Sequence, residues 1–211
     1  MPEIVNPRIE EYLRRLYDDG DPVRLEMEEL AKKRRFPIVG PLVGRSLHQL
    51  ALSIGARHVF ELGSGYGYSA LHFARAVGPN GAVHCTDLDA ENVRLAKDFL
   101  TRVGLWDRVT YHQEDAASAL RKVGGTWDIV YNDVDKDGYP QMVELAYERL
   151  RKGGLFITDN TLWSGRVLDG EDDRSKDTAG VKEFTRRLFA HAGFLTRVDP
   201  TRDGVAVALK L

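Results

Sequence analysis

The spacing of hydrophobic residues changes once along the chain, and the change separates an N-terminal helical part from an alternating part. Apolar and charged positions first recur at helical intervals, which predicts helices over residues 6–18, 22–35 and 41–54. After residue 56, short β-rich runs predict strands over residues 57–62, 82–87, 108–113, 127–132, 155–159, 194–199 and 204–211. Helical patterns separate the first five strands at residues 68–77, 90–103, 115–123 and 139–151.

This regular alternation of strand and helix predicts the fold class. It is typical of a parallel sheet with helices on both faces, a doubly wound, Rossmann-like α/β fold. The connection Pro200–Asp203 is too short for a parallel crossover, so the last two strands are expected to be antiparallel. The chain has no repeat or long linker. We therefore expect one domain over residues 1–211, with helices in 1–54 and the sheet core in 55–211.

Composition narrows the functional classes without choosing among them. The 211 residues are 43% hydrophobic, enough for one full core, and the net charge of -2 gives no general attraction to nucleic acid or anionic membranes. No apolar run approaches the ~20 residues of a membrane span, and residues 1–17 lack the apolar core of a signal peptide. Cys85 is the only cysteine, and the histidines show no zinc-ligand spacing. We therefore expect a cytoplasmic protein without internal disulfides and without a membrane partner.

A glycine-rich turn, FELGSGYGYS, follows the first predicted strand and opens a helix. Gly63, Gly65 and Gly67 allow a tight turn and let a ligand approach the backbone, where the start of the helix offers free N–H groups. A dinucleotide fingerprint would require a glycine at position 68. This chain has Tyr68 there, which disfavours an NAD-linked oxidoreductase.

Two acidic residues near this turn indicate the kind of ligand. Glu61, two residues before the first glycine, suits a cationic ligand better than a pyrophosphate. Asp87 ends the next predicted strand, where a carboxylate can accept hydrogen bonds from both hydroxyls of a ribose. Together with the three glycines, these acids favour a binding site over a plain strand-to-helix turn.

Two further predicted strands end in polar tips, DIVYNDVDKDGY and LFITDNTLW. Ligands of a doubly wound sheet gather at the carboxyl ends of its strands, so Asp133, Asp159 and Asn160 are expected to converge beside the glycine turn. These side chains offer hard oxygen ligands without sulfur or imidazole. Such a set suits Mg²⁺, Mn²⁺ or Ca²⁺ rather than zinc or copper.

The residues ELGSGYG resemble the first motif of the class I S-adenosylmethionine-dependent methyltransferases. The resemblance implies the strand order 3-2-1-4-5-7-6 with an antiparallel C-terminal hairpin. It implies that Gly63 and Gly65 line the methionine portion of the cofactor, that Ser69 holds its carboxylate and that Asp87 holds its ribose. Asp115 and Ala116 would border the adenine, although Asp115 could equally cap the helix that starts there. The expected cofactor-binding set is Glu61, Gly63, Gly65, Ser69, Asp87, Asp115, Ala116 and Asp133.

The pattern D-x-D-K-D-x-Y, followed by TDNTLWSGRV, is similar to the cation-dependent small-molecule O-methyltransferases, the catechol and caffeoyl-coenzyme A group. The resemblance covers roughly residues 36–211. It implies that Asp133, Asp159 and Asn160 bind the metal, that Lys136 is the general base, and that the protein is a homodimer.

The expected reaction is transfer of the cofactor's methyl group to a phenol with a neighbouring oxygen. A divalent cation would stabilise the phenolate, and chelation through both oxygens would align the nucleophile with the methyl group. Lys136 can act as base only when neutral, which a nearby dication and sulfonium favour. The alternative is an exposed lysine paired with Asp135 or Asp137.

Other functions remain open from the sequence. Enzymes resembling this family methylate 5-hydroxyuridine in tRNA, where the hydroxyl also has an oxygen neighbour, and the basic run KKRR (32–35) could contact an RNA backbone. A small phenol ranks first because the overall balance of charge is acidic. A non-catalytic cofactor-binding protein is a further alternative, although no motif residue is missing.

Features near the two polar tips carry weaker predictions. Tyr139 and Trp163 could pack against an aromatic substrate, although single aromatic residues near strand ends more often belong to the core. Trp106 and Trp127 are assigned to packing. Residues 168–177 are rich in charge and are interpreted as a loop that could cover the substrate.

Overall fold

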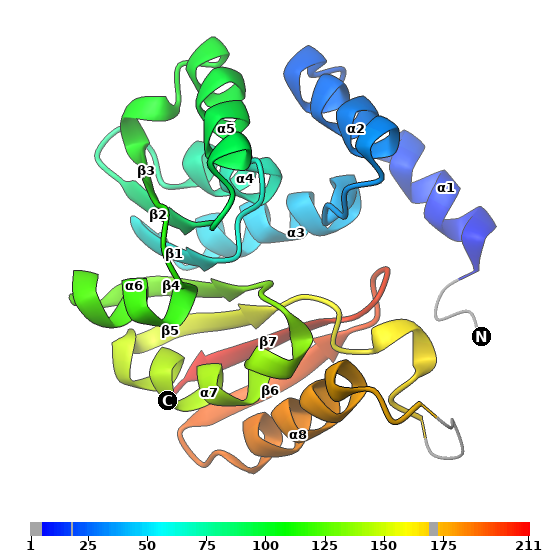
Figure 1. The fold of residues 1–211 in the computed structure, drawn as a ribbon, viewed down its shortest axis with the longest axis vertical. Coiled ribbons are helices and arrows are strands. Elements are labelled where there is room, and N and C mark those ends of the chain that lie inside the picture. The colour runs from blue at the N-terminus through cyan, green and yellow to red at the C-terminus, as the bar shows by residue number, and fades with distance from the viewer. Residues whose placement is uncertain (1–5, 18, 169–172) are drawn as a thin grey trace.

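Three helices form the N-terminal part of the structure, as the sequence predicts. The computed structural model describes residues 6–17, 19–168 and 173–211 (Figure 1). The helices are α1 (Pro7–Leu16), α2 (Pro22–Arg34) and α3 (Gly40–Ser53). The side chains of Asn6 and Asp21 cap α1 and α2, and each of these helices begins at a proline, which suits the first helical position.

A seven-stranded sheet with the order β3-β2-β1-β4-β5-β7-β6 runs through the rest of the described chain (Figure 1). Its strands are β1 (His58–Leu62), β2 (Ala82–Thr86), β3 (Val109–His112), β4 (Trp127–Asn132), β5 (Leu150–Thr158), β6 (Phe194–Asp199) and β7 (Val205–Lys210). Strands β1 to β5 pair in parallel, whereas β7 is antiparallel to both β5 and β6. The predicted fold class, strand order and C-terminal hairpin are confirmed.

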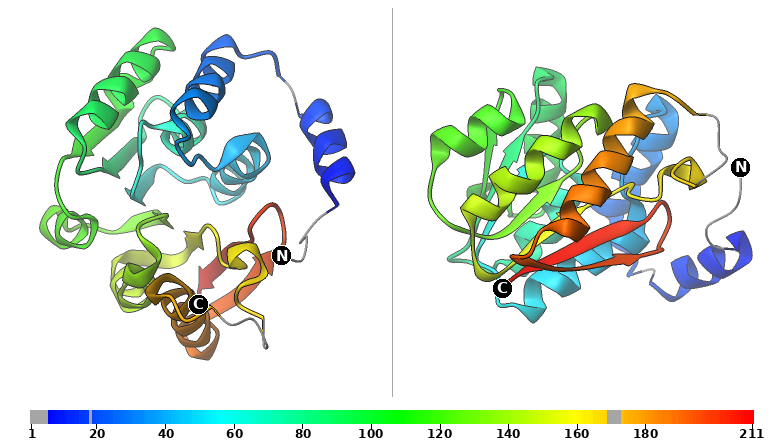
Figure 2. Two further views of the ribbon diagram at one scale, coloured as in Figure 1. Left: turned by 45° about the vertical axis from the view of Figure 1, so that its right-hand side comes forward. Right: turned by 90° about the horizontal axis from the view of Figure 1, so that it is seen from below.

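Helices cover both faces of this sheet (Figures 1 and 2). With α3, helices α4 (Tyr68–Ala76) and α5 (Ala90–Arg102) lie on one face. The other face carries α6 (Ala116–Val123), α7 (Tyr139–Arg149) and α8 (Lys176–Ala190). Short 3₁₀ helices are η1 (Trp106–Arg108), η2 (Lys136–Gly138) and η3 (Trp163–Gly165). Among the described residues, no helix combines the length and the apolar character needed to cross a membrane.

The boundary between α7 and β5 differs from the prediction. A helix was expected over residues 139–151 and a strand over 155–159, but α7 ends at Arg149 and β5 begins at Leu150. Leu150 pairs with Trp127, and the register then shifts before regular pairing resumes. The polar run between these pairs has no strand-like alternation of apolar residues, which is why the pattern did not reveal it.

Each face of the sheet packs against its own hydrophobic core. Val59 and Ile129 belong to the core under α3, α4 and α5, whereas their chain neighbours Phe60 and Val130 belong to the core under α6, α7 and α8. Successive strand residues point to opposite faces, so central strands buried on both sides carry apolar residues at most consecutive positions. The continuous apolar character of the predicted strands reflects this double burial.

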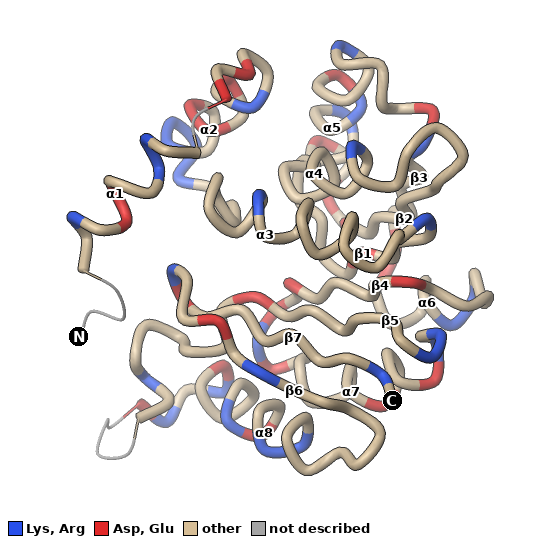
Figure 3. The backbone as a smooth tube through the Cα atoms, turned by 180° about the vertical axis from the view of Figure 1, so that it is seen from behind, with Lys and Arg blue, Asp and Glu red and all other residues tan. Residues whose placement is uncertain are grey.

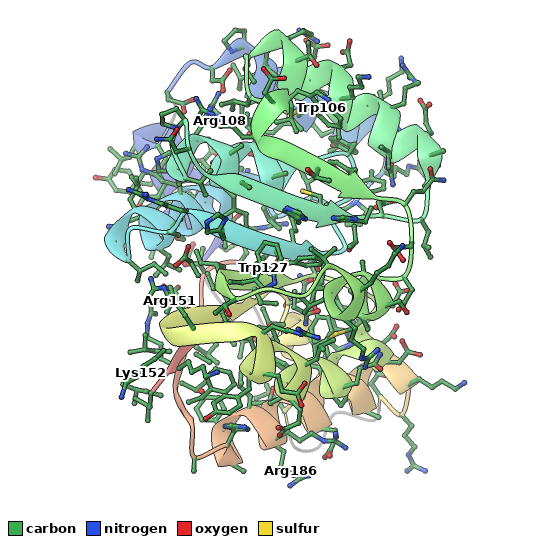
Figure 4. The ribbon with its side chains drawn as sticks, turned by 90° about the vertical axis from the view of Figure 1, so that its left-hand side faces the viewer. Trp106, Arg108, Trp127, Arg151, Lys152 and Arg186 are labelled. Carbon is green, nitrogen blue, oxygen red and sulfur yellow. The ribbon has the colours of Figure 1, made fainter. Side chains whose placement is uncertain are left out.

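The two tryptophans assigned to packing lie in different parts of the structure (Figure 4). Trp127, at the start of β4, is buried, and its ring meets Phe60 edge-on at a centroid distance of 5.0 Å. Trp106 is half-buried and stacks on Tyr111 at 6.0 Å. Both indole rings therefore pack within the protein, as predicted.

Candidate active site

A cavity of about 920 Å³ lies at the carboxyl ends of the central strands. Its walls include the turn after β1, the tips of β2, β4 and β5, the end of α2 and the segment that joins α2 to α3. Of the predicted site residues, it is lined by Gly63, Gly65, Ser69, Asp87, Asp115, Ala116, Asp133, Lys136, Asp159 and Asn160. The glycine turn and the two polar strand tips therefore share one cavity.

Two glycines of the turn are required by close approaches. Gly63 has φ +80°, and a Cβ there would lie 2.7 Å from the backbone oxygen of Asp133. Gly65 has φ +51°, and its Cβ would lie 2.9 Å from the ring of Phe36. Any side chain at either position would be strained and would push neighbouring segments apart. Glycine thus allows the turn to lie directly against the β4 tip.

Glu61 lies beneath this turn and is not among the residues that line the cavity. Its carboxylate is fully buried and accepts a hydrogen bond from Ser69 Oγ, with Cys85 Sγ at 3.7 Å. Burial raises the pKa of Glu61 to about 8, and the hydrogen bond from Ser69 acts in the opposite direction. The cavity-lining Ser69 therefore stands between Glu61 and any ligand, and direct contact of Glu61 with the cofactor stays a prediction.

The raised pKa of Glu61 predicts a pH-dependent cost in stability. The folded state holds this proton more tightly than the unfolded chain, so stability falls as pH rises from about 4.5 towards 8. Glu61→Gln removes the titration while keeping an acceptor for Ser69. We expect urea unfolding to show the variant gaining about 3–4 kcal/mol relative to the wild type between pH 5 and pH 8. Parallel stability curves for the two proteins across that range would contradict the assignment.

The residues predicted to hold ribose and adenine lie at the tips of β2 and β3. Asp87 Oδ1 accepts hydrogen bonds from the backbone of Asp89 at 2.8 Å and from Asn92 Nδ2 at 3.2 Å. Asp115 Oδ1 accepts from Ser118 N at 2.8 Å and caps α6, which lowers the pKa of Asp115. The capping role considered for Asp115 is therefore present, and the residue also lines the cavity.

Asp159, at the tip of β5, has the most unusual surroundings of the predicted metal ligands. The residue is 2% exposed, and its Oδ1 is buried without a hydrogen-bond partner among the described residues. Its backbone is fixed, because its N–H donates to Asn132 O at 3.2 Å and its carbonyl accepts from Tyr139 Oη at 3.0 Å. Burial, and then the charge of Asp133, raise the pKa of Asp159 to about 7. A buried carboxylate in this state needs a cation or a proton.

Asn160 follows directly in a left-handed conformation, with φ +55°. Its Nδ2 faces Asp203 Oδ2 at 3.5 Å, which leaves the amide oxygen as the atom free to act as a ligand. In the part of the chain that the structure describes, no three His, Cys, Asp or Glu side chains are arranged to hold a metal ion. A metal site here therefore needs the amide oxygen of Asn160 beside the two carboxylates.

Lys136 lies between the β4 tip and two aromatic rings. Its side chain is 13% exposed, and Nζ donates to Asp133 Oδ1 at 2.9 Å and to Val134 O at 3.3 Å. The ammonium lies 5.0 Å from the ring centre of Tyr139 and 5.8 Å from that of Trp163. The ion pair is made with the predicted metal ligand rather than with Asp135 or Asp137, so the alternative of an exposed, solvated lysine does not describe this residue.

Comparison with known proteins identifies the family to which this chain belongs. The model of the O-methyltransferase family matches residues 26–211. The chain belongs to the O-methyltransferase family. The expected enzyme class, an S-adenosylmethionine-dependent O-methyltransferase, is thereby confirmed. Membership also counts against the two other classes considered, a non-catalytic cofactor-binding protein and an NAD-linked oxidoreductase.

Individual relatives of this O-methyltransferase agree with that assignment. A catechol O-methyltransferase from Niastella koreensis is 30% identical over 184 residues, which cover 81% of this chain and 81% of the relative. Caffeoyl-CoA O-methyltransferase 2 from Populus trichocarpa is 31% identical over 199 residues, 88% of this chain and 81% of the relative. The crystal structure of a methyltransferase from Geobacter sulfurreducens is 31% identical, with a TM-score of 0.84, and the match covers 99% of this chain and 100% of that one.

The aromatic residues near the tips of this O-methyltransferase pack against the protein core, Tyr139 fully buried and Trp163 half-buried. Tyr139 is fully buried and packs edge-on against Phe184 at 5.3 Å. Trp163 donates from Nε1 to Thr178 Oγ1 at 2.9 Å and does not line the cavity. The predicted covering loop, residues 168–177, lies partly outside the described residues, because positions 169–172 are not described.

Sequence analysis missed one part of the cavity wall of this O-methyltransferase. The wall includes residues 36–41, which run from the connection after α2 into the first turn of α3, and Arg202, at the tip of the β6–β7 hairpin. No local motif marks either segment. Topology could have found Arg202, because an antiparallel β7 beside β5 places the preceding turn at the carboxyl end of β5, next to Asp159 and Asn160.

Proposed function

We propose that this enzyme methylates a hydroxyl next to a second oxygen on a small aromatic molecule, using S-adenosylmethionine and a divalent cation. The supporting observation is the shared cavity, which is lined by Asp133 and Lys136 after β4, by Asp159 and Asn160 after β5, and by the glycine turn. Its volume of about 920 Å³ is large enough for a nucleoside cofactor together with a small acceptor. The similarity to catechol and caffeoyl-CoA O-methyltransferases supports the same substrate class.

The glycine-turn side of the cavity suits the cofactor. S-adenosylmethionine supplies an electrophilic methyl group carried on a sulfonium. Gly63 and Gly65 line the wall where its methionine portion would lie, and Ser69 lines the same wall. Asp87, at the tip of β2, is positioned to accept from ribose hydroxyls, and Ala116 leaves room for a flat base at the start of α6.

The residues at the β4 and β5 tips fit a hard divalent cation. The buried Oδ1 of Asp159 has no partner among the described residues, and the half-buried carboxylate of Asp133, which pairs with Lys136, lines the same cavity. Burial raises the pKa of both carboxyl groups. Asp133, Asp159 and Asn160 would hold Mg²⁺ or Mn²⁺, which prefer such oxygen ligands. A bound cation would supply Lewis-acid stabilisation for an acceptor hydroxyl that loses its proton.

Lys136 is the proposed general base. Its ammonium donates to Asp133 Oδ1 at 2.9 Å, so the amine must lose its own proton and this contact before it can accept one from the acceptor. The contact with Val134 O and the neighbouring rings of Tyr139 and Trp163 restrain the side chain beside the strand tip. These contacts limit the rotamers that Lys136 can adopt, so the amine is already positioned to act as a base.

The distribution of charge favours a small acceptor over RNA. Figure 3 shows Lys and Arg positions interspersed with Asp and Glu positions along the described elements. In the KKRR run, Lys32 pairs with Glu29 at 2.5 Å, and the end of α2 lines the cofactor cavity. Extensive contact with phosphates needs several uncompensated cations, so tRNA stays the alternative acceptor.

A labelling experiment tests this acceptor class. With S-adenosylmethionine labelled in the methyl group and Mg²⁺, we expect label in caffeic acid and none in p-coumaric acid, which has a single ring hydroxyl. A tRNA containing 5-hydroxyuridine is the second acceptor offered. Label in the tRNA alone would replace the small phenol, and equal labelling of both acids would show that a neighbouring oxygen is not needed.

We also infer a homodimer, which the resemblance implies. Helix α1 has no buried residue, and Ile9, Tyr12 and Leu16 are 53%, 60% and 58% exposed. These residues recur at helical spacing and form an apolar stripe that a second copy would cover. Sedimentation of the protein at micromolar concentration tests this inference.

A further inference from the structure

The tip of the β6–β7 hairpin contacts a second segment of the cavity wall far away in the sequence. Arg202 Nη1 donates to Ile38 O at 2.8 Å and also to Val39 O, 164 and 163 residues away. These carbonyls belong to residues 36–40, here called the cap segment, which runs from the end of α2 to the start of α3. Both the cap segment and Arg202 line the cavity.

The same hairpin tip is fixed to the segment that follows β5. Asp203 accepts from Ser164 N through Oδ1 and faces Asn160 Nδ2 through Oδ2. Its backbone oxygen accepts from Leu162 N at 2.8 Å. Gly204, with φ +83°, permits this approach, because a Cβ there would lie 2.4 Å from the Leu162 side chain. Arg202 therefore projects from a turn that is held rigidly beside Asn160.

The cap segment has a second anchor at its other end. The ring of Phe36 packs against Tyr66 with centroids 5.0 Å apart, and it lies over Gly65 of the glycine turn. Phe36 thus attaches the cap segment to the cofactor side of the cavity. Arg202 attaches it to the side of Asp159 and Asn160, where the metal and the acceptor are proposed to bind.

We propose that Arg202 is a positioning residue that latches the cap segment over the acceptor end of the cavity. A guanidinium suits this task because it presents several donors in a fixed plane and stays charged, so one side chain can hold two adjacent carbonyl oxygens. Gly40, with φ +72°, leaves space for it, since a Cβ there would lie 3.3 Å from Arg202 Nη1.

Arg202 lines the cavity together with Asp133, Asp159 and Asn160, while its hydrogen bonds go to the cap segment. Opening the latch exposes the acceptor end to water and leaves the cofactor end held by Phe36.

The test compares Arg202→Met, Arg202→Lys and a control, Arg197→Met. Arg197 lies on β6 of the same hairpin, is 58% exposed and pairs with Asp199 outside the cavity. Hydrogen–deuterium exchange of residues 36–45 in the ligand-free protein measures how firmly Arg202 holds the cap segment, independently of catalysis. We expect exchange there to be about tenfold faster in Arg202→Met, the scale of a lost charge-assisted hydrogen bond, intermediate in Arg202→Lys and unchanged in Arg197→Met.

Steady-state kinetics with caffeic acid measure the effect of the latch on acceptor binding. This part of the test rests on the proposed function. We expect Arg202→Met to raise KM for the acceptor about tenfold, with kcat and the Kd of S-adenosylhomocysteine changed less than threefold. Phe36→Ala, at the other anchor, should instead weaken S-adenosylhomocysteine binding.

Three results would overturn the latch. The first is an exchange rate over residues 36–45 of Arg202→Met that equals the wild-type rate. The second is faster exchange throughout the chain of this variant, which would mark a merely structural role. The third is an unchanged KM of this variant for the acceptor. If the wild type methylates no vicinal phenol, the proposed function fails, and the exchange result still decides the latch by itself.

Discussion

Replacing Lys136 with methionine is expected to lower kcat by about 10²–10⁴-fold, the usual contribution of a general base, with little change in cofactor affinity. Methionine keeps an unbranched chain of similar length, whereas the ammonium beside the rings of Tyr139 and Trp163 is removed. The ammonium and its ion pair with Asp133 are lost. Steady-state kinetics with caffeic acid and calorimetric titration with S-adenosylhomocysteine measure the two quantities.

Lys152→Met is the matched control for this substitution. Lys152 is exposed on β5, outside the cavity, and lies at the edge of the molecule in Figure 4. We expect this variant to retain wild-type kcat. If Lys136→Met instead keeps kcat within a factor of ten of the wild type, proton removal does not depend on this amine, and the ion pair with Asp133 is only structural.

Replacing Asp159 with asparagine is expected to reduce Mg²⁺-dependent methyl transfer by about 10²–10³-fold, because a ligand charge worth several kcal/mol is removed. Stability should change in the opposite direction. The wild-type chain buries the carboxylate of Asp159 beside Asp133, and burial raises its pKa to about 7. Removing that charge should stabilise the metal-free protein by about 1–3 kcal/mol at pH 8. Activity assays and urea unfolding without metal measure the two effects.

The combination of lower activity and higher stability separates a functional acid from a structural one. A carboxylate that mainly held the fold together would lose both activity and stability when it was replaced. Asp98→Asn serves as the control, since Asp98 is exposed on α5 and pairs only loosely with Arg102, at 3.6 Å. We expect it to leave both quantities unchanged. Loss of stability in Asp159→Asn would argue against the proposed role.

The fold was predictable because its signals are local and repeated. Central strands such as β1 and β4 are apolar at successive positions, and turns and helices of regular length separate them. The start of β5 was missed because only Leu150 pairs with β4 before a register shift, and pairing resumes at Leu155 after a run with no apolar alternation. Local pattern cannot report pairing that depends on the neighbouring strand.

The part of the candidate site that lies at the ends of the strands could be predicted from the sequence. Asp133, Asp159 and Asn160 follow predicted strands, so parallel topology alone brings them to one edge. The position of Glu61 beneath Ser69 could not be read, because both faces of β1 are buried and the sequence does not say which face meets the ligand. The contact of Arg202 with Ile38 was invisible because it joins two connecting segments 164 residues apart.

The central claim is that the carboxylates of Asp133 and Asp159 and the amide oxygen of Asn160 hold a single hard cation at the end of the cofactor cavity. Crystals grown with Mn²⁺ and S-adenosylhomocysteine, with anomalous scattering recorded from the metal, test it most directly. The account predicts one anomalous peak within about 2.5 Å of carboxylate oxygens of Asp133 and Asp159 and of Oδ1 of Asn160. A cavity with cofactor but no such peak, or a peak held by other residues, would contradict it.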